Sequence, residues 1–140
     1  TLYSSYDVMP LEAGVKADGE YTLAENVADL GGFIIAYDAY ANYLDSHGFK
    51  GDGRRLQLQR FYQAVAYMFC AKWTAEYARL RTVGNDPADS KPSPYRKDNH
   101  LLFRERVNGV VCNTDSWYDL FEVKPGNKLY LAPESRVRIW

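Results

Sequence analysis

Apolar residues recur at helical spacing in the first half of the chain. Between positions 27 and 44 they fall three or four residues apart, which makes one stripe about six turns long on a helix. Thr22 and Glu25 fit a capping box, in which the Thr side chain accepts a backbone N–H and the Glu side chain reaches back. We therefore expect this helix to begin at Thr22. His47 and Gly48 predict its end, because glycine commonly follows the last helical residue.

A second stripe of the same helix carries acids and then small residues. It consists of Glu25, Asp29, Gly32 and Ala36, and Gly31 stands beside Gly32. A glycine inside a helix costs roughly 1 kcal/mol relative to alanine. Small residues allow close approach of another backbone, so we expect a neighbouring backbone against this face.

The next part of the chain predicts two shorter helices. A Gly-containing loop at Phe49–Arg55 leads to a helix over Leu56–Trp73, and Thr74 is the expected N-cap of another over Ala75–Arg81. A long loop with three prolines follows over Val83–Asp98. Loops of this length inside compact domains are often functional.

The last third of the chain mixes short elements. Arg106–Val111 predicts a short strand or an extended segment, and Asn113–Asp115 caps a short helix. Tyr130–Trp140 reads as extended. The whole pattern predicts a mainly α fold with few short strands.

Composition narrows the function classes. The 140 residues suit one domain, and 17 Lys and Arg against 18 Asp and Glu argue against an electrostatic nucleic-acid partner. No apolar run approaches the ~20 residues that a membrane-spanning helix needs. Cys70 and Cys112 lack metal-ligand spacing, and the sequence leaves open whether they pair.

Glu25 and Asp29 stand one helical turn apart, so both carboxylates project from one face. No basic residue lies one turn away on the helix to pair with them. Like charges at this spacing repel by roughly 0.2–0.5 kcal/mol, so the pair needs a cation, a proton or solvent. Zinc with an intervening histidine would satisfy both acids, because one carboxylate would bind the metal and the other would accept the second N–H of the ligating His.

Three blocks of the sequence carry a family resemblance. Glu25–Gly32 resembles the E-N-x-A-D-x-G-G helix of the neprilysin and endothelin-converting-enzyme family of zinc endopeptidases. Asp98–His100, followed after five residues by Arg106–Gly109, resembles that family's D-x-H and R-V-N-G stretch. Val123–Gly126 with residues 136–140 resembles its C-terminal end. The resemblance covers essentially the whole chain.

The resemblance implies roles for four residues. Glu25 matches the third zinc ligand of the family, and Asp29 matches the carboxylate that orients a ligating His. His100 matches the His that stabilises the oxyanion of the tetrahedral intermediate, and Arg106 matches the Arg that hydrogen-bonds a substrate carbonyl. The implied fold is the C-terminal helical part of a zincin-like catalytic domain. The implied activity is extracytoplasmic hydrolysis of peptide bonds in oligopeptides by zinc-activated water.

The sequence departs from the family pattern at one motif. The H-E-x-x-H helix, which supplies two zinc ligands and the general base, is absent, and His47 and His100 are the only histidines. In the family that helix lies upstream, so we interpret residues 1–140 as the C-terminal portion of the peptidase domain. Such a piece would neither hydrolyse peptides nor retain zinc alone. Its expected partner is the missing N-terminal part of the polypeptide, and its uncovered apolar surface would favour self-association.

Other interpretations stay open at the level of sequence. Glu25 could serve only as a capping residue, and Arg106 could form a structural ion pair, for example with Asp29. The alternative function is a non-catalytic helical module that binds peptides or partners on a peptidase scaffold. An H-E-x-x-H motif encoded upstream would exclude that module.

Overall fold

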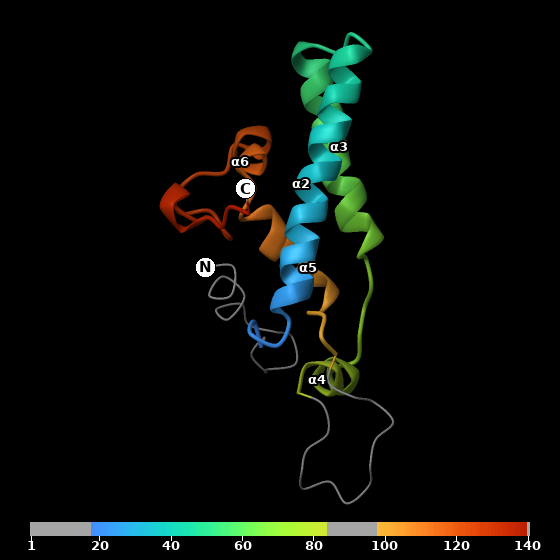
Figure 1. Cartoon of the computed structure of the whole chain (residues 1–140), viewed down its shortest axis with the longest axis vertical. Helices are drawn as coiled ribbons and strands as arrows, with labels where there is room; N and C mark the ends of the chain where they lie inside the picture. The colour runs from blue at the N-terminus through green and yellow to red at the C-terminus, as the bar shows by residue number, and fades with distance from the viewer. Residues whose placement is uncertain (1–17, 84–97, 140) are drawn as a thin grey trace, which may run out of the picture.

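Two long antiparallel helices organise the molecule. The structure is a computed structural model that describes residues 18–83 and 98–139. Helix α2 spans Leu23–Ser46 and helix α3 spans Gly51–Met68, and the two lie side by side in Figure 1. Within the described ranges the chain is helical without a strand, so the prediction of a mainly α fold is confirmed.

Four shorter elements complete the described chain. Helix α5 (Phe103–Val111) packs against α2, and helix α6 (Asp115–Phe121) packs against α3. Helix α4 (Ala75–Val83) lies beyond the lower end of the long pair in Figure 1. A single 3-10 turn, Pro133–Ser135, interrupts the C-terminal segment that was expected to be extended throughout. Trp140, the last residue of that predicted segment, lies outside the described residues.

The end of α2 is confirmed where the sequence placed it. Gly48 adopts φ +77°, a left-handed conformation that glycine adopts without the strain of a side chain. Its N–H donates to Asp45 O at 3.1 Å, and the Phe49 N–H donates to Leu44 O at 3.0 Å. These two bonds satisfy carbonyls of the last helical turn and reverse the chain into α3.

Helix α3 begins at Gly51, five residues before the expected Leu56, so the predicted loop at Phe49–Arg55 was too long. The glycines in this stretch have low helix propensity, yet the stretch is helical and makes a contact with α2. Arg54 donates to both carboxylate oxygens of Asp45, from Nε at 2.6 Å and from Nη2 at 3.0 Å. This bidentate pair holds the first turn of α3 against the last turn of α2.

Helix α3 also ends five residues earlier than expected, at Met68 instead of Trp73. Beyond it, Trp73 stacks on Tyr77 with ring centroids 4.8 Å apart and meets Phe103 edge-on at 5.1 Å. This packing favours a non-helical segment at residues 70–74, between α3 and α4. The predicted cap of α4 is confirmed, because Thr74 Oγ1 accepts the Tyr77 N–H at 3.2 Å.

The prediction of a strand or extended segment at Arg106–Val111 was wrong, because these residues belong to helix α5. Valines favour strands when considered locally. Arg106, Val107 and Val110 nevertheless recur at helical spacing, and all three face the pocket between α5 and α2. Burial of this face outweighs the local preference.

The core lies where α2, α3, α5 and α6 meet. Tyr62 of α3 is 5% exposed and its hydroxyl hydrogen-bonds Thr114 at 3.0 Å and Ser116 at 2.7 Å, which joins α3 to the start of α6. Burial raises the pKa of Tyr62 to about 12. Tyr37, Tyr40 and Phe61 pack against the core while partly buried. The buried residues that form the core cluster are Leu30, Phe33, Leu44, Leu58, Tyr62, Ala78, Leu101, Leu102, Val110 and Leu120.

The glycine pair of α2 behaves differently from the expectation. Gly31 is buried, but a Cβ placed on Gly32 would meet no atom within 4 Å among the described residues. The neighbouring backbone that we expected against Gly32 is therefore not found in this part of the chain.

The two cysteines are free in the structure: Cys70 is exposed and Cys112 is buried. Burial raises the pKa of the Cys112 thiol to about 12. None of the described helices is both long enough and apolar enough to cross a membrane.

Two leucines of α3 provide a matched test of this packing. Leu58 is 2% exposed and Leu56 is 47% exposed. Leu58→Ala should lower the free energy of unfolding by about 2–5 kcal/mol, because it leaves a cavity in the core. Leu56→Ala, the control, should change it by less than about 0.5 kcal/mol. Urea denaturation followed by circular dichroism measures both, and equal effects would contradict the described core.

Candidate functional site

The two acids of α2 bind different partners from the second half of the chain. Asp29 contacts α5, and Glu25 contacts the segment that precedes α5. The Asp29 side chain is 18% exposed and the Glu25 side chain is 33% exposed. The helix itself offers no basic neighbour to these acids, but Asn99 and Arg106 from the second half of the chain contact them.

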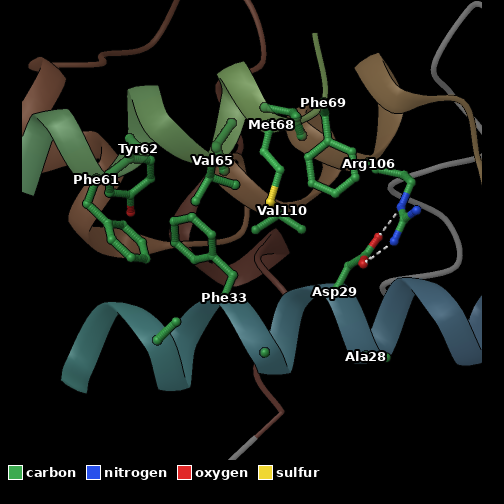
Figure 2. A pocket seen from close by; sticks show the side chains of 14 residues that line it. Ala28, Asp29, Phe33, Phe61, Tyr62, Val65, Met68, Phe69, Arg106 and Val110 are labelled. Atoms are coloured by element: carbon green, nitrogen blue, oxygen red, sulfur yellow. Dashed lines mark hydrogen bonds and ion pairs between the residues drawn. The ribbon is translucent and has the colours of Figure 1, made fainter. Parts of the chain in front are cut away.

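Asp29 and Arg106 form a bidentate ion pair. Arg106 donates from Nε to Asp29 Oδ2 at 2.7 Å and from Nη2 to Oδ1 at 2.6 Å (Figure 2). The guanidinium also lies over the Phe69 ring, with Cζ 4.9 Å from the centroid. The hydrogen bond to Asp29 raises the pKa of Arg106, so the cation is firmly maintained. The structural ion pair left open by the sequence is therefore present.

His100 lies between two carboxylates. Its Nδ1 is 3.0 Å from Asp98 Oδ1, and its Nε2 is 3.1 Å from Glu25 Oε2. The His100 backbone N–H also donates to Asp98 Oδ1 at 2.8 Å. Burial alone would raise the pKa of Asp98, but the hydrogen bonds from His100 and the charge of Arg81 outweigh it and hold that pKa below its usual range.

Glu25 makes no capping box. Thr22 is the N-cap residue without a side-chain cap bond, and its hydroxyl donates to Asp18 O at 2.8 Å. Glu25 Oε1 instead accepts from Asn99 Nδ2 at 3.0 Å, while Oε2 faces His100. The carboxylate therefore points toward the segment before α5 and away from its own helix start.

An apolar pocket of about 250 Å³ lies beside the Asp29–Arg106 pair, between α2, α3 and α5. In Figure 2 Asp29 and Arg106 close one end of it, and Phe33, Val65 and Met68 point into it. Its lining residues are Ala28, Asp29, Gly32, Phe33, Ala36, Phe61, Tyr62, Val65, Met68, Phe69, Arg106, Val107, Val110 and Val111.

The donor set for a metal is incomplete in the described ranges. Carboxylate oxygens and imidazole nitrogens are the ligands that zinc takes, and a catalytic site uses three of them from the protein. Residues 18–83 and 98–139 contain no group of three or more His, Cys, Asp or Glu side chains that could hold a metal ion. Glu25 can therefore supply one ligand of such a set, with the others from elsewhere.

A family model identifies the chain: the model described as peptidase family M13 matches residues 1–137. The chain belongs to peptidase family M13. This confirms the resemblance inferred from the three sequence blocks.

Named relatives agree with the family assignment. The M13 chain is 28% identical over 135 residues to a neutral endopeptidase of Lactococcus lactis subsp. cremoris, which covers 96% of the chain and 18% of the relative. It is 29% identical to endothelin-converting enzyme 1 of Cavia porcellus, over 99% of the chain and 16% of the relative. Human neprilysin is also 29% identical, over 93% of the chain and 16% of the relative. The chain thus spans less than a fifth of these relatives. No solved structure matches significantly.

The structure brings the four predicted site residues of this M13 chain into one neighbourhood. Asp29 meets Arg106 directly, and Glu25 meets His100. The sequence analysis assigned no role to Asp98, Asn99 or Arg81, although Asp98 and Asn99 belong to the D-x-H block. No local pattern marks Arg81, because its contact with Asp98 depends on the tertiary fold.

The Asp29–Arg106 pair should show measurable energetic coupling. In a double-mutant cycle with Asp29→Asn and Arg106→Gln we expect a coupling of about 1–3 kcal/mol, because both side chains are mostly buried and the contact is bidentate. The Asp45–Arg54 pair at the other end of α2 is the matched control. Its side chains are 55% and 33% exposed, so Asp45→Asn and Arg54→Gln should couple by only about 0.2–1 kcal/mol. Equal coupling of the two pairs by urea denaturation would contradict the described geometry.

Proposed function

We propose that Glu25, Asp29, His100 and Arg106 are part of the site of a zinc-dependent metalloendopeptidase that hydrolyses peptide bonds in oligopeptides. Membership of family M13 supports the peptidase activity. The observation that carries the proposal is the position of His100 Nε2, 3.1 Å from Glu25, beside an Asp29–Arg106 pair. A potential ligand, a hydrogen-bond donor and a fixed cation thus lie on one face of α2.

In this proposal Glu25 holds zinc and two further ligands come from outside the described residues. A bound zinc ion would polarise the scissile carbonyl and lower the pKa of a water molecule. Glu25 suits ligation because its present partners are an amide and an imidazole, which a metal can replace at lower cost than a guanidinium. Asp29 keeps spare lone pairs beside Arg106, so it remains able to accept an N–H from a ligating His.

His100 is the proposed donor to the oxyanion. Asp98 Oδ1 accepts the His100 backbone N–H and lies within hydrogen-bond distance of Nδ1, which fixes the ring plane. Nε2 is then the nitrogen that can donate to a developing negative charge when the ring is protonated.

Arg106 is the proposed contact for a substrate carbonyl. Its Nε and Nη2 each donate one hydrogen bond to Asp29, which leaves Nη1 and the second N–H of Nη2 for a substrate. The adjoining apolar pocket suits an apolar side chain of the substrate.

The chain itself is proposed to be the C-terminal part of an extracytoplasmic peptidase domain. Its small share of the relatives' length supports this. The remaining ligands would then come from the N-terminal part of the same polypeptide. The non-catalytic binding module is the alternative, and the encoded residues that precede Thr1 distinguish the two.

The first test reads those residues for H-E-x-x-H and then measures zinc content and peptide hydrolysis of the protein that contains both segments. Glu25→Gln should lose zinc. His100→Gln should keep zinc and lower kcat by about 10²–10³-fold, the cost of removing an oxyanion donor. His47→Gln, at the other end of α2, should change neither quantity. Zinc loss in His100→Gln would overturn its role, and the absence of H-E-x-x-H would favour the binding module.

Self-association of the 140-residue chain is a separate prediction. Tyr67 and Met68 are 82% and 71% exposed, and Met68 also lines the pocket. Exposed apolar surface of this kind promotes association. Light scattering should show dimers or larger species at high concentration, and Met68→Lys should reduce them. A wild-type chain that stays monomeric would contradict the prediction.

A further inference from the structure

Arg81 and Asp98 meet at two points although 16 residues separate them in the sequence. The Arg81 guanidinium forms an ion pair with Asp98 Oδ2, and the Asp98 backbone N–H donates to Arg81 O at 2.9 Å. The side chains are 29% and 17% exposed, respectively. Arg81 therefore fixes both the backbone and the carboxylate of Asp98 at the end of α4.

The two carboxylate oxygens of Asp98 have separate partners. Oδ2 faces Arg81, and Oδ1 accepts the His100 backbone N–H at 2.8 Å and lies 3.0 Å from His100 Nδ1. Rotation of the carboxylate would move Oδ1 away from both of these nitrogens. The contact at Oδ2 opposes that rotation.

Arg81 is itself held by aromatic packing. Its Nη1 is 3.5 Å from the Tyr77 hydroxyl, and its Cζ lies 5.9 Å from the Tyr77 ring centroid. Tyr77 stacks on Trp73, which meets Phe103 at the start of α5. The Arg81 guanidinium is thus linked through these aromatic rings to α5, the helix that carries Arg106.

We propose that Arg81 is a positioning residue that acts through Asp98 to fix the His100 ring with its Nδ1 bonded to Asp98 and its Nε2 facing Glu25. The functional meaning of this orientation rests on the proposed role of His100. The orientation itself is a property of the chain without metal or substrate. It can therefore be tested separately from zinc binding and hydrolysis.

The test is the tautomer of His100 in the 140-residue chain, read from the ring ¹⁵N chemical shifts at a pH where the ring is neutral. Two carboxylates compete for the single ring proton, Asp98 at Nδ1 and Glu25 at Nε2. We expect the Nδ1–H form in the wild type. In Arg81→Gln most of the Nδ1–H population should be lost, because the Asp98 carboxylate becomes free to rotate. In Arg81→Lys part of that population should remain.

The sign of the change distinguishes positioning from a purely electrostatic effect. Removing a cation makes Asp98 a stronger acceptor, so a purely electrostatic role predicts an unchanged or larger Nδ1–H population in Arg81→Gln. That result would overturn the proposal. Arg79→Gln removes the same charge from an exposed position of α4 and should leave His100 as in the wild type. His47 serves as the internal reference, because its Nδ1 contacts Tyr43 O at the far end of α2.

A second pair of variants covers the case in which Arg81→Gln loses its helical circular dichroism. Asp98→Ala removes the acceptor and should abolish the Nδ1–H form, while Arg81→Lys should keep part of it. Identical His100 spectra for these two variants would overturn the proposal. Failure of zinc binding with the expected tautomer change would instead refute only the proposed function.

Discussion

The bidentate Asp29–Arg106 pair is the contact on which the arrangement of the site depends. It joins α2 to α5 across 77 positions of sequence, with both side chains less than a fifth exposed. Separating the partners would leave charge with little solvent, which is costly. A one-residue shift of α5 would turn Arg106 by about 100° around its helix axis. The pair therefore fixes the register of α5, and with it the segment that carries His100 to Glu25.

The two acids of α2 differ in the partners that satisfy them. Asp29 is bound by a guanidinium through two short bonds, whereas Glu25, which is more exposed, is bound by Asn99 and faces His100. Charged bidentate contacts are the stronger and more directional kind. Asp29 is thus tied to α5 by a charged pair, while Glu25 keeps partners that can be exchanged. These contacts from the second half of the chain offset the repulsion of the acid pair.

Regular periodicity made the long elements predictable, and tertiary contacts decided the rest. The bounds of α2, the cap of α4 and the position of the helix after Thr114 are confirmed, although the capping box expected at the start of α2 is absent. The sequence misplaced both ends of α3 because Arg54 and Trp73 contact residues of other elements, Asp45 and Phe103. It misread α5 because valine favours strands locally. The motifs singled out four candidate residues, but the contact of Arg81 with Asp98, which in turn contacts His100, depends on the fold.

The pocket explains why α2 carries small residues at Gly32 and Ala36. Gly32 and Ala36 form part of its lining, opposite Met68 and Phe69 of the α3 end. A Cβ on Gly32 would meet open space within the described part of the chain, so close backbone contact there does not account for the glycine. Larger side chains at these positions would fill the pocket beside Arg106. The helix tolerates a glycine that costs roughly 1 kcal/mol at the point where the absence of a side chain gives the pocket its depth.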